Sequence, residues 1–130
     1  MSDAKQFAAI FEGLNLAYGT YRIDRQQNNG KNTGKATVVK APRTDEMWEN
    51  HLSGKGDALG IIPINEENKV TWGCIDVDTY PLDHTELIQK IRRMKLPLVV
   101  CRSKSGGAHC FLFVDQWVAA KEMQEVLQHV

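Results

Sequence analysis

Residues 75–78 read Ile-Asp-Val-Asp, and residues 103–109 read Ser-Lys-Ser-Gly-Gly-Ala-His. Asp76 and Asp78 are two positions apart, so a β-strand would place both carboxylates on one face. The second stretch is a glycine-rich, cationic turn whose backbone N–H groups, serine hydroxyl and imidazole could hold phosphate oxygens. Carboxylates that bind a divalent cation beside such a turn indicate chemistry on a nucleoside triphosphate.

The segment between the two motifs has room for one helix and one strand. An apolar stripe with helical spacing predicts a helix that starts at Asp83 or Thr85, and residues 98–101 are an apolar run typical of a strand covered on both faces. A right-handed strand–helix–strand crossover brings the second strand alongside the first, or nearly so. Both motifs would then lie at the carboxyl-terminal edge of parallel strands, where open α/β sheets bind ligands. The apolar stripe consists of Leu87, Ile88, Ile91 and Met94.

The whole pattern predicts an α/β fold with a mixed sheet and flanking helices. Residues 58–62 and 70–77 are two apolar runs joined by a polar turn, and we expect them to form a hairpin. Before these runs, we expect a helix that ends near Gly19 and carries Phe7, Ile10, Phe11 and Leu14 on one face. A mobile polar loop at residues 26–34, a strand at 36–39 and a helix from the N-cap Thr44 to about residue 52 should follow. The last expected elements are a strand at 110–114 and a helix at 119–127.

Composition indicates one ordinary globular domain over residues 1–130, because 42% of the 130 residues are apolar. The formal net charge is +0, so no global field attracts the chain to nucleic acid or to a membrane. Residues 22–43, however, hold six basic residues and one acid, Asp24. This local excess is compatible with a polyanionic partner and equally with a solvated polar loop. We interpret residues 1–43 as a basic N-terminal segment.

The three cysteines, Cys74, Cys101 and Cys110, all fall in apolar, strand-like runs. None is part of a Cys-x-x-Cys pair, which argues against a zinc site. An odd number of cysteines and an opening segment without an apolar leader fit buried thiols in a reducing cytoplasm. The chain also has no apolar run long enough to span a membrane.

Each motif has a simpler interpretation when it is taken alone. The strand could end at Ile75, which would leave both acids as exposed turn residues before Pro81. The glycine-rich turn could be a polar hairpin with incidental basic residues. The spacing of the two motifs favours the joint interpretation, because one crossover would bring both to the same crevice.

The arrangement resembles the archaeo-eukaryotic primase superfamily, the primase-polymerases. The first motif of that family is Asp-x-Asp on a strand, matched by Asp76 and Asp78, and the second is a Ser-x-His or a Ser-Gly-Gly-x-x-His-like turn, matched by residues 105–109. The context before the acids, residues 48–64, looks like the primase domain of TOTE conflict systems and related phage proteins. The resemblance covers residues 44–114 and implies the N-terminal αβ portion of a primase-polymerase catalytic module.

The resemblance implies template-directed nucleotidyl transfer in DNA replication by a DNA primase or polymerase. A primer 3′-hydroxyl on single-stranded DNA or a primer–template would attack the α-phosphate of the nucleoside triphosphate, with Mg²⁺ or Mn²⁺ as cofactor. We expect Arg102 and Lys104, which flank the second motif, to neutralise charge as pyrophosphate leaves. Carried over to this chain, the catalytic residues are Asp76, Asp78 and His109, the metal ligands are Asp76 and Asp78, and the triphosphate contacts are Ser105, Gly106, Gly107 and His109.

The family also has a third motif, an apolar residue followed by Asp or Glu on a later strand. Asp115 follows an apolar run but lies directly after the second-motif strand, so we interpret it as a helix-start or turn residue. We therefore expect catalysis only if a third acid from outside this chain, in a C-terminal domain or a protein partner, completes the site. One alternative is a catalytically incomplete, stand-alone protein of the phage-encoded kind that binds nucleotide, nucleic acid or a host protein. Another is a metal-dependent nuclease or phosphotransferase that shares the acid pair.

Overall fold

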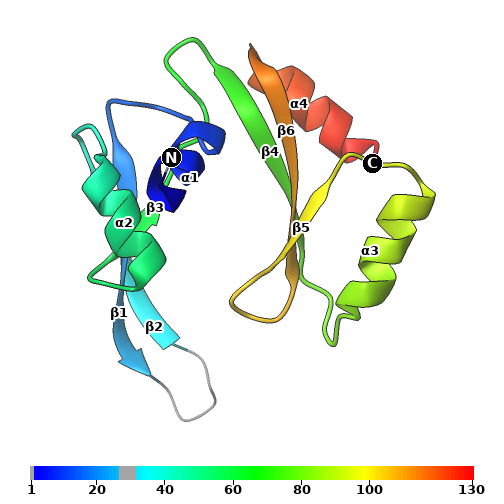
Figure 1. Cartoon of the computed structure of the whole chain (residues 1–130), viewed down its shortest axis with the longest axis horizontal. Helices are drawn as coiled ribbons and strands as arrows, with labels where there is room; N and C mark the ends of the chain where they lie inside the picture. The colour runs from blue at the N-terminus through cyan, green and yellow to red at the C-terminus, as the bar shows by residue number, and fades with distance from the viewer. Residues whose placement is uncertain (1, 27–31) are drawn as a thin grey trace. The chain divides into compact units, whose positions relative to one another are not determined.

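The computed structural model describes residues 2–26 and 32–130 and contains two three-stranded antiparallel sheets with four helices (Figure 1). The sheets belong to two compact units, residues 1–68 (unit 1) and residues 69–130 (unit 2). Helices and strands are mixed in both units, which confirms the α/β class. The single domain expected over residues 1–130 stays a prediction.

Unit 1 is built around a central strand, β1, which pairs antiparallel with β2 on one side and with β3 on the other. Because Tyr21 pairs with Ala58 and also with Ala36, β1 is bonded along both edges. Two helices complete the unit. The elements are α1 (Asp3–Ile10), β1 (Tyr18–Gln26), β2 (Asn32–Val39), α2 (Asp45–Ser53) and β3 (Ala58–Gly60).

The two helices of unit 1 pack together through aromatic rings. The ring of Trp48, which is buried, lies 5.9 Å from that of Phe7 and 6.2 Å from that of Phe11, centroid to centroid. Thr44 caps α2 as expected, since its hydroxyl accepts a hydrogen bond from the Met47 N–H at 3.3 Å. Gly54 ends the helix at φ 77°, a conformation that favours glycine.

Two predictions for unit 1 are wrong. The first helix ends at Ile10 rather than near Gly19, because the Leu14 N–H bonds to the Ile62 carbonyl at 2.8 Å and the chain then starts β1. The hairpin expected between residues 58–62 and 70–77 does not form, because β3 bonds to β1 of its own unit instead. The short strand expected at residues 36–39 is the end of the longer β2.

The polar loop predicted for residues 26–34 is partly strand. Gln26 is the last residue of β1 and pairs with Asn32, the first of β2. Residues 27–31 lie outside the described residues, so the predicted loop is described only at its two ends. Gly34 belongs to β2, and a Cβ at this position would clash with the Tyr21 ring.

Unit 2 is a sheet with the order β4-β6-β5 and two helices. Its central strand, β6, is antiparallel to both neighbours, so β4 and β5 run in the same direction with β6 between them. The predicted strand–helix–strand crossover is therefore present, and its two strands are one strand apart rather than adjacent. The elements are β4 (Lys69–Val77), α3 (His84–Arg93), β5 (Val99–Arg102), β6 (Ala108–Ala119) and α4 (Ala120–Gln128).

The core of unit 2 lies on one face of this sheet. Ile91 of α3 packs there with Ala108 and Cys110 of β6, which are 0% and 2% exposed. Gly73 of β4 lies under α4 on the same side, where a Cβ would meet Met123 and Leu127. The partly buried residues packed against this core are Ile75, Val77, Leu82, Leu87, Leu96, Leu98 and Val100.

The helices of unit 2 follow the sequence expectations. Asp83 is the N-cap of α3, because its carboxylate accepts a hydrogen bond from the Glu86 N–H at 3.1 Å. The strand expected at residues 110–114 is longer, and Asp115 lies inside β6 rather than at a turn or helix start. The register with β4 is irregular there, because Val70 pairs with Val118 while Trp72 pairs with Phe113, so the strand continues past several unpaired residues.

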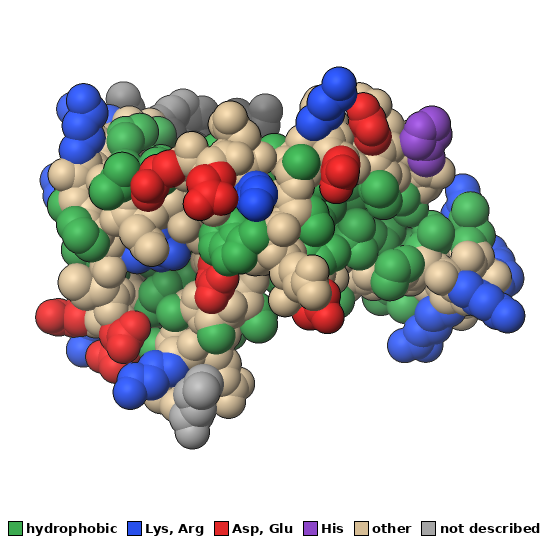
Figure 2. All heavy atoms as spheres, turned by 90° about the horizontal axis from the view of Figure 1, so that it is seen from above, with side chains coloured by type: hydrophobic (Ala, Val, Ile, Leu, Met, Phe, Trp, Pro, Cys, Tyr) green, Lys and Arg blue, Asp and Glu red, His purple; other side chains and the backbone are tan. Residues whose placement is uncertain are grey.

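Charged side chains of both signs lie on the face of the molecule that is shown in Figure 2. On the face seen in Figure 2, acidic and basic side chains are interspersed across much of the molecule, with apolar side chains visible between them. Within the described residues, none of the helices has the length and apolar character needed to cross a membrane.

Candidate functional site

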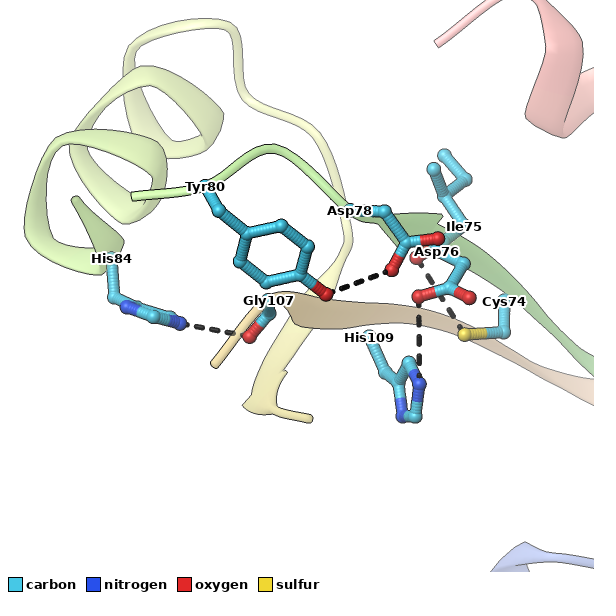
Figure 3. Close-up of polar contacts among 8 residues, drawn as sticks. All are labelled: Cys74, Ile75, Asp76, Asp78, Tyr80, His84, Gly107 and His109. Carbon is cyan, nitrogen blue, oxygen red and sulfur yellow. Dashed lines mark hydrogen bonds and ion pairs between the residues drawn. The ribbon is translucent and has the colours of Figure 1, made fainter. Parts of the chain in front are cut away.

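The two acids of the first motif lie at the end of β4, on the face opposite the core. Ile75 and Val77 pack into the core, so the alternating residues Asp76 and Asp78 face the other way, and both are exposed. Figure 3 shows their carboxylates on the same side of the strand. Because β4 runs to Val77, the interpretation that ends this strand at Ile75 is wrong.

Each carboxylate contacts a polar side chain. The Tyr80 hydroxyl donates a hydrogen bond to Asp78 Oδ1 at 3.3 Å, and His109 Nε2 lies 3.5 Å from Asp76 Oδ1 (Figure 3). Asp76 and His109 are directly opposite each other on β4 and β6. The two side chains stay 59% and 43% exposed, so this pair adds little to folding stability and remains accessible to a ligand.

The second motif forms the turn between β5 and β6, residues 103–107, here called the glycine turn. The Ser103 N–H bonds to the Gly107 carbonyl at 3.0 Å, and the Gly106 N–H bonds to the Ser103 carbonyl at 3.1 Å. Gly106 has φ 90°, which favours glycine. Gly107 needs glycine for a different reason, because a Cβ would clash with the backbone oxygen of Val77. The turn therefore lies directly against the end of β4.

The polar residues of the second motif differ in where they lie. His109 is the second residue of β6 and faces Asp76, as described above. Lys104 and Ser105 are exposed in the glycine turn. Arg102 pairs with Ala108, whose position is on the core side, so Arg102 leaves the sheet on the face opposite His109. The register thus brings His109, but not Arg102, to the face of the two acids.

A residue that sequence reasoning did not select also contacts the glycine turn. His84, the first residue of α3, is half-buried, and its Nε2 lies 2.9 Å from the Gly107 carbonyl oxygen (Figure 3). From the sequence it is an ordinary surface or cap histidine. Only the fold brings it to a turn that lies 23 positions away, so no local pattern could have identified it.

The acids also affect the neighbouring thiol. Partial burial, together with the negative charge of Asp76, raises the pKa of Cys74 to about 11. Burial likewise raises the pKa of Cys110 on the core side. Both thiols are therefore protonated at neutral pH and are poor metal ligands in that form.

The acid pair fits a hard divalent cation. Two exposed carboxylates on one strand face provide oxygen ligands of the kind that Mg²⁺ and Mn²⁺ prefer. Among residues 2–26 and 32–130, no group of three or more His, Cys, Asp or Glu side chains could hold a metal ion. This donor set suits a cation held by one or two carboxylates and otherwise by water and substrate phosphates, rather than an all-protein cage.

Comparison with known proteins agrees with the motifs. The model of the TOTE conflict system archaeo-eukaryotic primase domain matches residues 14–130, which extends beyond the motif region at both ends. No curated protein matches the chain. A match over nearly the whole chain shows the family, so the chain belongs to the archaeo-eukaryotic primase domains of TOTE conflict systems, a family of the nucleotidyl-transfer type.

Proposed function

We propose that this chain binds a nucleoside triphosphate together with Mg²⁺ or Mn²⁺ and takes part in template-directed nucleotidyl transfer. One observation carries the proposal: two motifs separated by a whole helix and strand meet at one edge of one sheet, where Asp76 faces His109 and the glycine turn lies against β4. Nucleotide transfer needs a cation site and a phosphate site side by side. Membership of the primase family supports the same chemistry.

Asp76 and Asp78 would hold the divalent cation. Their exposed carboxylates leave the remaining coordination positions for water and for the triphosphate, the usual arrangement for Mg²⁺ in such enzymes. When bound, the cation supplies Lewis-acid stabilisation of the charge that develops at the reacting phosphate. His109 contacts Asp76 through one ring nitrogen, which orients the ring at the border between the cation site and the phosphate site.

The glycine turn would hold the triphosphate. Ser105 is exposed, and neither its amide nor its hydroxyl has a hydrogen-bond partner among the described residues, so both are available to phosphate oxygens. Gly106 carries no side chain that would keep phosphate from the backbone, whereas the missing side chain of Gly107 lets β4 lie against the turn. Lys104 in the turn adds positive charge, which favours binding of a polyanion and departure of pyrophosphate, whereas Arg102 leaves the sheet on the opposite face and adds only to the net charge near the turn.

The second substrate would be single-stranded DNA or a primer–template. The primer 3′-hydroxyl attacks the α-phosphate, a new P–O bond forms, the bond to pyrophosphate breaks, and the hydroxyl proton passes to solvent or a base. The basic excess of residues 22–43 is a further feature that suits a polyanionic partner. A third carboxylate, from a C-terminal domain or a protein partner, would complete the catalytic site.

Binding without catalysis is the second candidate function. It is favoured by the donor set, since within the described residues two carboxylates rather than three or more ligands come together. In that case the chain would bind nucleotide or nucleic acid at the same edge of the sheet and leave the transfer step to another protein. Both functions share the binding step, so the first experiment tests that step alone.

The experiment compares thermal unfolding of the wild type and of Asp76→Asn/Asp78→Asn, with and without ATP and Mn²⁺. A ligand at a hundredfold its dissociation constant stabilises the folded state by about 2.7 kcal/mol, which gives a clear rise in melting temperature. We expect this rise in the wild type and its loss in the double variant. Glu122→Gln/Glu125→Gln is the matched control, because it also removes two exposed carboxylates from unit 2.

Two results would contradict the proposal: no ATP-dependent rise in the wild type, or an equal rise in the Asp76→Asn/Asp78→Asn variant. If binding is present, extension of a labelled primer on a DNA template separates the two candidate functions. Extension that needs Asp76 and Asp78 indicates catalysis by this chain. Binding without extension indicates the second candidate function, in which this chain binds and another protein carries out the transfer step.

A further inference from the structure

The loop between β4 and α3 touches both motifs. At its start, Tyr80 donates a hydrogen bond to Asp78 at 3.3 Å. Directly after the loop, His84, the first residue of α3, lies with its Nε2 2.9 Å from the carbonyl oxygen of Gly107. Figure 3 shows the Tyr80 ring directed to the acid and the His84 ring directed to the glycine turn. One short segment thus connects the acid pair with the turn.

The Gly107 carbonyl oxygen accepts the hydrogen bond that closes the turn. It accepts one hydrogen bond from the Ser103 N–H at 3.0 Å, and the His84 ring supplies the second. A carbonyl oxygen has two lone pairs and donates nothing, so Nε2 of His84 must carry the proton. Both acceptor sites of this carbonyl are then used, which fixes the orientation of the last peptide of the turn.

Gly107 also lies close to the acid-bearing strand and to the loop that follows it. A Cβ on Gly107 would meet the backbone oxygen of Val77 and would lie 3.3 Å from the Tyr80 hydroxyl. Gly107 is buried, and the next residue, Ala108, is 0% exposed. The turn is therefore in contact with β4 on one side and is held by His84 on the other.

From these contacts we propose that His84 is a positioning residue, which acts through Gly107 to keep the glycine turn in place beside Asp76 and Asp78. Its value for ligand binding rests on the proposed function, in which the turn holds triphosphate and the acids hold the cation. With the ring in place, the phosphate-binding amides are ordered before the nucleotide arrives. Without it, the nucleotide must order the turn, and its affinity falls.

His84 is not needed to hold α3 itself. Asp83 caps the helix, and Ile91 anchors it in the core of unit 2. A variant that lacks the ring nitrogen should therefore keep the fold and lose order only in the turn. This local effect distinguishes a positioning role from a general contribution to stability.

The test compares the wild type with His84→Phe, which keeps an aromatic ring but cannot donate, and His84→Gln, whose amide N–H reaches about as far as Nε2. His129→Phe is the matched control, because His129 is an exposed histidine beyond the end of α4. Amide hydrogen exchange of the metal-free, nucleotide-free proteins is measured by NMR at Ser103, Gly106 and several core residues. Dissociation constants for ATP are then measured in the presence of Mn²⁺, and for Mn²⁺ alone.

We expect His84→Phe to accelerate exchange at the Ser103 amide by about five- to tenfold, the effect of losing one hydrogen bond, with core amides unchanged. His84→Gln should restore slow exchange, and His129→Phe should resemble the wild type. ATP affinity should fall by a similar factor in His84→Phe and recover in His84→Gln, whereas the affinity for Mn²⁺ alone should not change.

Two results would overturn the inference. One is unchanged exchange at Ser103 and Gly106 in His84→Phe, and the other is a uniform acceleration across unit 2 that His84→Gln fails to correct. The exchange measurement needs no ligand, so it decides the role of His84 even if the wild type does not bind ATP. Absence of ATP binding by the wild type would contradict the proposed function and leave the positioning of the turn to be judged by exchange alone.

Discussion

The two faces of the β4-β6-β5 sheet are formed by the same strands but differ in their side chains and in their exposure to solvent. Ile75 of β4 pairs with Cys110 of β6 on the face covered by α3, whereas the next pair along, Asp76 and His109, lies on the opposite face. On the covered face Cys110 is 2% exposed. On the opposite face the Asp76 side chain is 59% exposed.

This alternation places the side chains of the core and those of the candidate site on opposite faces within a few residues. Burial of apolar side chains supplies most of the folding free energy, and an exposed ion pair supplies little. The covered face therefore fixes the register, because a shift by one residue would exchange Asp76 with its apolar neighbours. The core holds the candidate site in place, and the candidate site contributes little to the core.

The largest effect should come from the covered face, at Ile91. Replacing Ile91 by Ala removes a buried side chain that is 8% exposed and leaves a cavity against Ala108 and Cys110. We expect a loss of about 2–5 kcal/mol in the free energy of unfolding, measured by urea denaturation. Gln89→Ala, at an exposed position of the same helix, is the control and should change it by less than about 0.5 kcal/mol. A cost below 1 kcal/mol at Ile91 would show that this face is not the core.

An intermediate effect on stability is expected at Gly107, where the glycine turn lies against the end of β4. A methyl group there would clash with the Val77 carbonyl, so Gly107→Ala must displace the turn from β4. We expect a destabilisation of about 1–3 kcal/mol by chemical denaturation, the usual cost of overpacking.

Gly54→Ala provides the comparison for Gly107→Ala. Gly54 has φ 77° but open space around it, so the added methyl group costs only backbone strain, about 1–2 kcal/mol. Nucleotide binding in the presence of Mn²⁺ should weaken in Gly107→Ala and not in Gly54→Ala. Equal nucleotide affinity in the two variants would show that the glycine turn is not part of the nucleotide-binding site.

Local patterns were sufficient to predict the parts of the molecule that depend on neighbours in sequence. The apolar stripe predicts that α3 starts at Asp83 or Thr85, and Asp83 is its N-cap. Asp76 and Asp78 were expected on one face because strands alternate, and they are. The family model confirms the resemblance drawn from these motifs and extends it to residues 14–130.

Long-range pairing was not predictable from the same patterns. An apolar run shows that a strand exists but not which strand it pairs with. The sequence therefore predicts that β3 pairs with β4, whereas β3 pairs with β1. The strand β1 itself went unrecognised, because polar and charged residues such as Arg22 interrupt its alternation. The contact between His84 and Gly107 likewise depends on the crossover and has no local signal.

A small effect on stability is expected on the exposed face, at His109. Removing its ring with His109→Ala breaks the contact with Asp76, an exposed pair of the kind that contributes about 0.2–1 kcal/mol. Urea denaturation at neutral pH should detect no larger loss, whereas the affinity for ATP with Mn²⁺ should fall by tenfold or more if His109 bonds to phosphate. A loss of more than 2 kcal/mol in the free energy of unfolding would mean that His109 is a core residue. The two faces of the sheet would then not differ in their contribution to stability.

The smallest effect concerns the pH dependence that Cys74 adds on this exposed face. Its folded-state pKa of about 11 lies above the ordinary value of 9.0, so the folded state keeps the thiol proton that the unfolded chain releases. This contribution to stability is complete below pH 9 and is lost as pH rises towards 11. Since Cys74 is exposed, solvent screening reduces this contribution to the free energy of unfolding to about 0.3 kcal/mol.

Cys74→Ser isolates this contribution, because it removes the thiol at little cost in volume. In buffer with a chelator, so that no cation reaches Asp76, the unfolding free energy of the wild type should fall slightly more steeply between pH 8.5 and 10 than that of Cys74→Ser. Other groups titrate in the same range in both proteins, so only the difference between the two slopes reports on the thiol. A steeper fall in Cys74→Ser would reverse the sign of the pKa shift and would remove Asp76 as a neighbour that acts on this thiol.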